Sequence, residues 1–117
     1  MPRRFSLRRA AAGLALGAGL LASVQTPAAG PPAPERAAAL RDLVLQDCGS
    51  CHGLRLKGGL GPALTPEALR GRPPELLAAT VLDGRPGTPM PPWRPFLTEA
   101  EARWIVEALR RGDFLER

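Results

Sequence analysis

Apolar residues recur at helical spacing in the stretch that leads to the chain's two cysteines. Ala37, Leu40, Val44 and Cys48 follow one another at intervals of three, four and four residues. Residues at these intervals lie on one face of a helix. The pattern predicts a first helix over about residues 35–47, whose inner face leads to Cys48.

The strongest helical pattern lies near the C-terminus, where both helix ends are marked. Thr98 and Glu101 have the spacing of a capping box, and Gly112 is a residue type at which helices commonly end. The apolar stripe between them comprises Ala102, Ile105, Val106 and Leu109, with Trp104 and Ala108 beside it. The pattern predicts a last helix over about 98–112.

Two shorter helices are predicted between these two. Thr65, Pro66 and Glu67 supply an N-cap hydroxyl, a first-turn proline and a first-turn acid, and this helix should end near Gly71. The next helix should span about 74–82. Its expected inner face comprises Leu76, Leu77, Thr80 and Val81. Together the patterns predict an all-α fold of about four short helices.

The N-terminal residues have a different pattern, which separates them from the predicted domain. Arginines up to Arg9 precede an uncharged apolar run over 10–22, and small residues and prolines follow. This order is typical of a secretory signal peptide. We predict a signal peptide over 1–29 with cleavage between 22 and 29, a linker over 30–34, a domain over 35–112 and a tail over 113–117. An uncleaved anchor stays open as an alternative, although the apolar run is short for a membrane span.

Without this leader the chain is nearly neutral. Its 117 residues include 16 Lys and Arg against 11 Asp and Glu, a formal charge of +5. Four arginines precede residue 10 and no acid precedes Glu35, so the mature part carries 12 cationic residues against 11 acids. The basic excess belongs to the leader and does not indicate nucleic-acid binding. The 88 residues after Ala29 contain no Tyr and few aromatic residues. A core of this size usually needs a cross-link, a metal ion or a bound cofactor to be stable.

The candidate chemistry lies in the stretch Cys48-Gly49-Ser50-Cys51-His52. Two thiols separated by two residues and followed at once by an imidazole are typical of c-type haem attachment. Each thiol can add to one vinyl group of the haem, and the histidine can bind the iron as proximal ligand. A covalently attached haem would also fill the centre of a small core. The sequence predicts one haem c, held by Cys48 and Cys51 and ligated by His52.

Other interpretations of this stretch lack the residues that they need. A structural zinc site takes about four Cys or His ligands, and the chain has only three such side chains. A thioredoxin-like redox pair normally follows a strand, whereas a helix is predicted before Cys48. A disulfide between Cys48 and Cys51 would close a very small loop and add little stability.

The segment 53–63 is rich in glycine and precedes the second predicted helix. It is either a flexible turn or a backbone that lies close to the haem edge, where side chains would not fit. It is no phosphate-binding loop, because no Gly-Lys-Ser/Thr sequence ends it. A proximal histidine usually donates its second ring nitrogen to a carbonyl. The carbonyl of Pro62 is the candidate for that role.

Met90 is the candidate for the second axial ligand. It lies in a proline-rich segment, 38 residues after the only histidine, and it is the only methionine outside the leader. Prolines on both sides hold the backbone extended. Lys57 is a weaker alternative, because its amine would first have to lose its proton. Arg85, Thr88 and Trp93 are candidates for contacts with the haem propionates or ring.

The order of these features resembles the small monohaem class I cytochromes c over about residues 35–112. More narrowly, the chain resembles cytochrome c-55X, a group of short periplasmic cytochromes that accompany haem d1-containing nitrite reductases in denitrifying bacteria. The segments that carry this resemblance are 47–53, 58–66, 83–85 and 87–93. The resemblance implies the class I cytochrome c fold, thioether bonds at Cys48 and Cys51, and axial ligation by His52 and Met90. It also implies electron donation to a cytochrome cd1 nitrite reductase, with a suggested part in haem d1 maturation.

We therefore expect a periplasmic one-electron carrier and not an enzyme. Apart from the haem, the sequence offers no acid–base pair or nucleophile for chemistry. We expect a monomer with no membrane span after leader cleavage, and little long-range electrostatic steering toward its redox partner. The rival hypothesis is a haem-binding assembly factor or sensor that releases Met90. Trp104 is interpreted equally well as a core aromatic or as part of an electron-transfer route.

Overall fold

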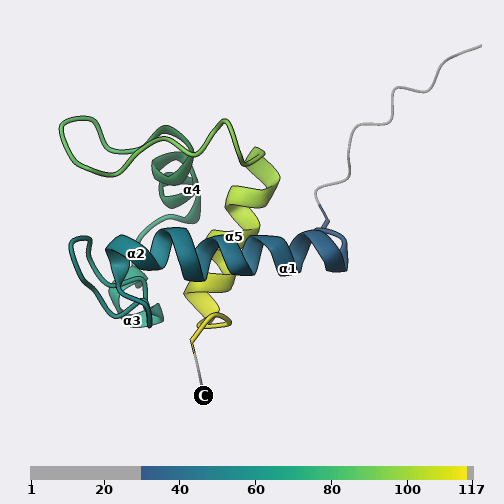
Figure 1. Ribbon diagram of the computed structural model, residues 1–117, viewed down its shortest axis with the longest axis horizontal. Coiled ribbons are helices and arrows are strands. Elements are labelled where there is room, and N and C mark those ends of the chain that lie inside the picture. The colour runs from purple at the N-terminus through teal and green to yellow at the C-terminus, as the bar shows by residue number, and fades with distance from the viewer. Residues whose placement is uncertain (1–29, 116–117) are drawn as a thin grey trace, which may run out of the picture.

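The computed structural model describes residues 30–115, and these residues form helices and loops without a strand (Figure 1). The prediction of an all-α fold is confirmed. The elements are α1 (Pro34–Leu43), η1 (Val44–Cys48), α2 (Gly49–His52), α3 (Pro66–Leu69), α4 (Pro74–Asp83) and α5 (Glu99–Arg111). Within this part of the chain, no helix is long and apolar enough to cross a membrane. The predicted signal peptide and the end of the predicted tail lie outside the described residues.

The first three elements form one continuous rod. The prediction that the first helix ends near residue 47 is wrong, because η1 is a π-helical turn and the backbone stays helical to His52. Gly53, at φ 93°, ends the rod. A π turn adds a residue without breaking a helix and is common at functional sites. The cysteines and the histidine therefore lie on a helix, where residues i, i+3 and i+4 are neighbours.

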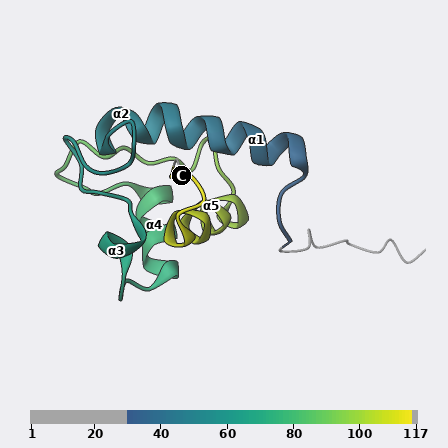
Figure 2. The same cartoon turned by 90° about the horizontal axis from the view of Figure 1, so that it is seen from below.

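Helix α5 crosses this rod and supplies much of the core (Figures 1 and 2). The predicted capping box is confirmed: Glu101 N donates to Thr98 Oγ1 at 3.2 Å, and Thr98 N donates to the Glu101 carboxylate at 2.8 Å. Gly112 ends the helix in the left-handed conformation. The buried stripe of α5 comprises Ala102, Ile105, Val106, Ala108 and Leu109.

The rod meets this stripe through the face that the sequence predicted. Leu40 and Val44 are fully buried. The Trp104 ring of α5 and the Phe114 ring, just beyond the C-terminal end of α5, lie edge to face with centroids 6.1 Å apart. The Arg41 guanidinium lies 5.7 Å from the Phe114 ring centre. These contacts make Trp104 part of the packing that joins α5 to α1.

Helix α4 packs against α5 through a different face from the one predicted. Its buried residues are Ala78 and Leu82, one helical turn apart. The prediction that Leu76 faces inward is wrong: it is 60% exposed, because a residue two positions from Ala78 lies on nearly the opposite side of the helix. Leu77 and Val81, which flank the buried stripe, are half-buried.

Candidate functional site

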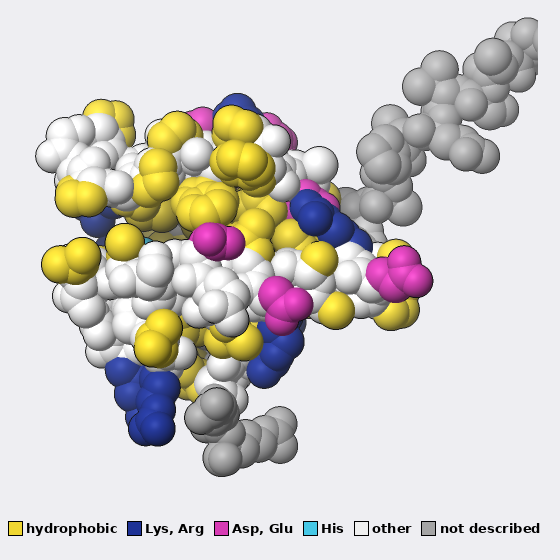
Figure 3. All heavy atoms as spheres, viewed as in Figure 1, with side chains coloured by type: hydrophobic (Ala, Val, Ile, Leu, Met, Phe, Trp, Pro, Cys, Tyr) yellow, Lys and Arg dark blue, Asp and Glu magenta, His cyan; other side chains and the backbone are white. Residues whose placement is uncertain are grey.

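Two long loops lie at the same end of the molecule in both ribbon views (Figures 1 and 2). One loop joins α2 to α3 over residues 53–65 and follows the Cys-x-x-Cys-His stretch. The other joins α4 to α5 over residues 84–98 and contains Met90. The space-filling view shows a notch in the surface between the part that carries the α4–α5 loop and the part that carries the α2–α3 loop (Figure 3). The sequence-predicted site residues therefore gather at one end of the fold, from two separate segments.

The imidazole of His52 is oriented by the chain's own backbone. Its Nδ1 lies 2.7 Å from the carbonyl oxygen of Pro62. A carbonyl can only accept a hydrogen bond, so Nδ1 carries the proton and donates it. The lone pair on Nε2 is then left for a metal ion. The half-buried ring is fixed in both direction and tautomer by this one contact.

The glycines of the α2–α3 loop allow the backbone to lie against the rod. A Cβ on Gly61 would come within 2.8 Å of the His52 ring, and one on Gly59 within 2.8 Å of the Cys51 carbonyl oxygen. Two backbone hydrogen bonds hold this approach: Gly58 N to His52 O at 2.7 Å, and Gly61 N to Cys51 O at 2.8 Å. A loop held in this way is not a free turn, and its approach to the haem edge stays a prediction.

The two thiols are unlinked and lie in different surroundings. Cys48 is half-buried against the core, and burial raises the pKa of its thiol to about 11, with the nearby Asp47 carboxylate adding to the shift. Cys51 is exposed. Within residues 30–115, no three side chains of His, Cys, Asp or Glu gather as a metal-binding group.

Met90 is half-buried and lies at the end of a compact turn in the α4–α5 loop. The Arg85 amide donates to the Met90 carbonyl at 3.2 Å. The Thr88 hydroxyl donates to the Arg85 carbonyl at 2.7 Å and accepts from the Met90 amide at 3.4 Å. Gly84 lies directly beneath this turn, since a Cβ there would be 2.7 Å from the Met90 carbonyl oxygen. Thr88 therefore acts within the loop itself, as a link between the two ends of the turn.

The far side of the same loop is tied to α4. The Trp93 amide donates to the carbonyls of Val81 and Leu82, each at 3.1 Å. Arg94 forms an ion pair with Asp83, with Nη2 and Oδ1 2.7 Å apart. The Trp93 ring is half-buried and lies with its centroid 5.9 Å from that of Phe96. Proline rigidity and these ties at its base together fix the loop that carries Met90.

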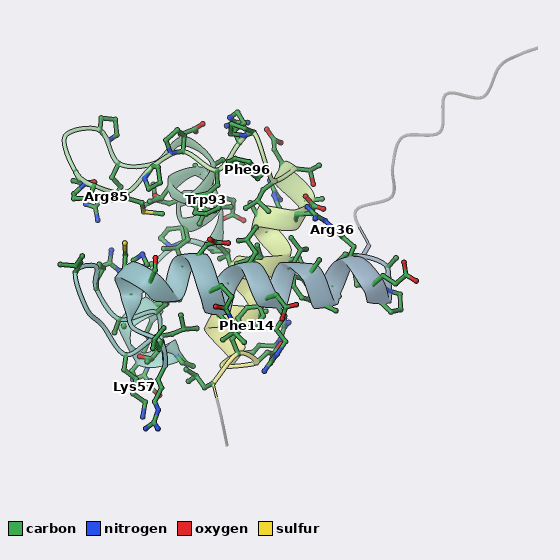
Figure 4. All side chains as sticks on the ribbon, viewed as in Figure 1. Arg36, Lys57, Arg85, Trp93, Phe96 and Phe114 are labelled. Atoms are coloured by element: carbon green, nitrogen blue, oxygen red, sulfur yellow. The ribbon has the colours of Figure 1, made fainter. Side chains whose placement is uncertain are left out.

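Figure 4 shows that Arg85 and Lys57, two further candidates for haem contacts, point in different directions. Arg85 lies on the α4–α5 loop, on the side that faces the α2–α3 loop. Lys57 extends from the α2–α3 loop away from the α4–α5 loop. Both side chains are exposed. Arg85 is thus beside the notch, whereas Lys57 is directed away from it.

The residues present fit a covalently bound haem c. The two thiols and the imidazole lie within five consecutive residues of the continuous helix, 48–52. The imidazole offers a free Nε2, and Gly61 leaves no side chain against the ring. Cys48 and Cys51 would hold the group by thioether bonds, and His52 would supply a nitrogen ligand. Sequence reasoning missed the positions that make this geometry possible, above all Gly61 and Gly84. The glycine-rich composition of segment 53–63 was the signal for the first, and the sequence carried none for a contact between Gly84 and the Met90 turn.

Comparison with known proteins places the chain among c-type cytochromes. Residues 35–107 match the protein-family model described as cytochrome c oxidase, cbb3-type, subunit III. The chain is 67% identical to cytochrome c55X of Pseudomonas aeruginosa over 82 residues, which are 70% of this chain and 69% of that protein. It is 56% identical to cytochrome c55X of Stutzerimonas stutzeri over 100 residues, which are 86% of this chain and 87% of that protein.

A solved structure agrees with these relatives. The structure of the c-type cytochrome NirC is 64% identical and superposes with a TM-score of 0.71, covering 73% of this chain and all of that chain. A shorter similarity links the chain to dihydro-heme d1 dehydrogenase of Pseudomonas aeruginosa, 40% identical over 67 residues, which are 57% of this chain and 14% of that protein. With 56–67% identity to cytochrome c55X over most of its length, the chain belongs to the cytochrome c55X family of c-type cytochromes, electron carriers rather than enzymes.

Proposed function

We propose that the chain is a periplasmic one-electron carrier with a single haem c, held by Cys48 and Cys51 and ligated by His52 and Met90. The observation that carries this proposal is the contact of 2.7 Å between His52 Nδ1 and the Pro62 carbonyl. It orients the imidazole and leaves Nε2 as the ligating atom. When bound, the haem supplies a one-electron iron couple, whose potential a thioether ligand raises.

Met90 fits the role of a ligand that stays in place. Pro89 and Pro91 restrict the backbone on either side. The turn from Arg85 to Met90 is closed by its own hydrogen bonds, and the loop base is tied to α4. A thioether on so constrained a loop would move little between the two oxidation states. Met90 from this loop, together with His52 from α2, would leave no ligand position of the iron open to other molecules.

We further propose that the redox partner is a cytochrome cd1 nitrite reductase. The proposal rests on membership of the cytochrome c55X family and on the near-neutral charge of the mature chain, +1 before the two haem propionates are counted. An almost neutral molecule should find its partner with little long-range steering and a modest overall salt dependence. A weak and transient contact would suit a carrier that must also leave.

Stopped-flow mixing of the reduced holoprotein with oxidised cytochrome cd1 nitrite reductase tests this function. We expect one-electron oxidation of the cytochrome at a rate that rises with the concentration of the reductase. The matched control is Met90→Ala, which retains the covalent haem but loses the proposed sixth ligand. A wild-type cytochrome that stays reduced beside an active reductase, while small oxidants oxidise it, would rule out the partner.

A second candidate function is assistance in haem d1 maturation, which the similarity to dihydro-heme d1 dehydrogenase favours. In that role the protein would exchange electrons with a maturation enzyme or hold the client reductase. The discriminating measurement is the haem d1 content of nitrite reductase purified from cells that lack this chain. A normal haem d1 content would favour the carrier alone, and a reductase without haem d1 would favour maturation.

A further inference from the structure

Positive charge is concentrated at one end of the described chain, although the molecule as a whole is nearly neutral. Residues 53–73 contain four cationic side chains and one carboxylate, whereas the rest of residues 30–115 contains seven against nine. The four cations are Arg55, Lys57, Arg70 and Arg72. All four are exposed, and none forms an ion pair with a described residue. The α2–α3 loop and α3 lie at the same end of the molecule in both ribbon views (Figures 1 and 2).

The conformation of the α2–α3 loop explains why its cations face solvent. Leu56, between Arg55 and Lys57, is fully buried and anchors the loop in the core. The Leu56 amide donates a hydrogen bond to the Gly53 carbonyl oxygen at 2.8 Å, and the Leu56 carbonyl accepts one from the Leu64 amide at 2.9 Å. Leu56 also has φ 56°, a conformation that is uncommon for a residue with a branched side chain. With Leu56 held inward, its two cationic neighbours are left on the surface, and Figure 4 shows Lys57 extending outward from this loop.

The same loop exposes two large apolar side chains next to the Cys-x-x-Cys-His stretch. Leu54 is 79% exposed and Leu60 is 93% exposed. The Leu54 backbone lies against Gly49, since a Cβ on Gly49 would be 3.7 Å from the Leu54 Cα. Leu60 stands between two glycines that pack on the Cys51 carbonyl. Exposed apolar residues with a charged surround are typical of protein–protein contact sites.

We propose that this surface, the cationic loop face made of Leu54, Arg55, Lys57 and Leu60, docks an acidic surface of a partner protein. The two leucines would form the apolar centre of the contact, and Arg55 and Lys57 would pair with carboxylates at its rim. The proposal rests on the proposed function, because the partner it describes is a redox protein that must reach the haem-bearing end of the chain. It adds which face is used and the sign of the charge that this face recognises.

A local patch and a small net charge act over different distances. A net charge near zero gives little attraction beyond one Debye length, about 10 Å at 0.1 M salt. Within that distance, the cationic loop face presents positive charge that the rest of the molecule does not offset locally. The modest salt dependence expected of partner association should therefore arise mainly from the positively charged end to which this face belongs. A second apolar site, the exposed Phe96 beside the half-buried Trp93, has its neighbouring Arg94 already paired with Asp83 and offers no such charge.

Electron transfer from the reduced holoprotein to small oxidants of opposite charge tests the sign of the surface. The oxidants are ferricyanide, an anion, and tris(phenanthroline)cobalt(III), a cation, each of which takes one electron. The variants are Arg55→Glu and Lys57→Glu, and the matched control is Arg103→Glu, an exposed arginine of α5 with the same change of charge. At low ionic strength we expect each loop variant to slow ferricyanide about threefold or more relative to the control, and to speed the cobalt complex.

Binding is tested separately, by titrating the labelled holoprotein with a hexaglutamate peptide and following its amide chemical shifts. We expect the shifts to concentrate in residues 53–61 and to disappear in Lys57→Glu but not in Arg103→Glu. A hexalysine peptide should leave this loop unshifted. Equal oxidation rates in the loop and control variants would overturn the inference, as would shifts confined to residues 91–97.

These outcomes are independent of the nitrite reductase. If the wild-type protein fails to reduce that enzyme but keeps the charge preference and the peptide shifts, the proposed partner is wrong and the surface stands. If the enzyme is reduced at one rate by wild type, Lys57→Glu and Arg103→Glu, the proposed function stands and the docking surface is wrong.

Discussion

The two loops that meet at the candidate site are held in opposite ways. The α2–α3 loop is rich in glycine and is fastened by backbone contacts to the helix that it follows, with Gly58, Gly61 and Pro62 all bonded to the Cys51-His52 turn. The α4–α5 loop is rich in proline and cannot use many backbone donors. It is held instead at its base, by amides that reach α4 and by ion pairs of Arg94 and Arg36.

This difference separates a local site from a site that depends on the whole fold. The orientation of His52 is set within eleven residues of sequence, 52–62. The position of Met90 depends on α4, on α5 and, through Arg36, on α1. Changes on the histidine side should therefore affect haem attachment, whereas changes on the methionine side should affect stability and the sixth ligand first. The following variants test that separation, in order of expected effect.

Gly84→Ala should have the largest effect on stability. Gly84 has φ 69°, and an added Cβ would come within 2.7 Å of the Met90 carbonyl oxygen and 2.8 Å of Pro91. Backbone atoms on both sides cannot yield easily, so we expect a loss of about 2–4 kcal/mol in the free energy of unfolding. Gly71→Ala is the control, because Gly71 has φ 73° but no atom near the added Cβ, and it should lose only about 1 kcal/mol. Denaturant unfolding of the two holoproteins measures both, and equal losses would contradict a crowded Met90 turn.

Gly61→Ala should affect the histidine side alone. The added Cβ would lie 2.8 Å from the His52 ring, which can rotate away but would then lose its contact with Pro62. We expect a lower yield of covalent haem and a loss of about 1–3 kcal/mol in stability. Haem staining after denaturing electrophoresis measures the yield, with Gly71→Ala again as control. A normal yield and an unchanged visible spectrum would show that the carbonyl contact is not what orients the imidazole.

Acid should weaken the tie between α1 and α5. The Arg36 guanidinium, 2.6 Å from Glu101, lowers the pKa of that carboxyl to about 2, and the Thr98 amide adds to the shift. A carboxyl with a lowered pKa stabilises the fold above its unfolded pKa, and this stability is lost as the pH falls from about 5 toward 2. We expect a contribution of about 1–2 kcal/mol, since Arg36 is partly exposed. Arg36→Ala should flatten the acid limb of a stability–pH curve, and Arg36→Lys should keep part of it. Parallel curves for wild type and Arg36→Ala would contradict this role.

Arg94→Ala should have the smallest effect. Its partners Asp83 and Glu99 are exposed, with N–O distances of 2.7 and 3.6 Å. Surface ion pairs of this kind contribute about 0–1 kcal/mol. We expect a small loss of stability at low salt and almost none in 1 M salt, where screening is strong. A large loss that salt does not reduce would mean that the loop base depends on Arg94 packing and not on its charge.

The sequence predicted most of what depends on local pattern. The capping box at Thr98, the buried face of Leu40 and Val44, and the stop at Gly112 follow from short-range rules and are all present. The end of the first helix was misjudged, because a π turn has no simple sequence signature and the helix continues to His52. The exposed position of Leu76 was also missed, since which face of α4 is buried depends on where α5 packs.

The features of the candidate site also fall into those that the sequence predicted and those that it did not. The Cys-x-x-Cys-His stretch and the Pro62 carbonyl were proposed from sequence because the chemistry dictates their spacing. The crowding at Gly61 and Gly84 was missed, because it depends on how each loop folds back on its own neighbours. The tie from Arg36 to Phe96 was also missed, because it joins residues 60 positions apart. Long-range contacts of this kind leave no periodic signal along the chain.

The most direct test of a closed His52–Met90 carrier is the visible spectrum of the exported holoprotein, oxidised and reduced, with and without carbon monoxide. We predict sharp reduced bands, a methionine-to-iron charge-transfer band in the oxidised form, and no change with carbon monoxide, whereas Met90→Ala should bind it. A haem stain should survive denaturation in both proteins. Ready binding of carbon monoxide by the wild-type protein, or the absence of covalent haem where a control cytochrome matures normally, would contradict the closed carrier.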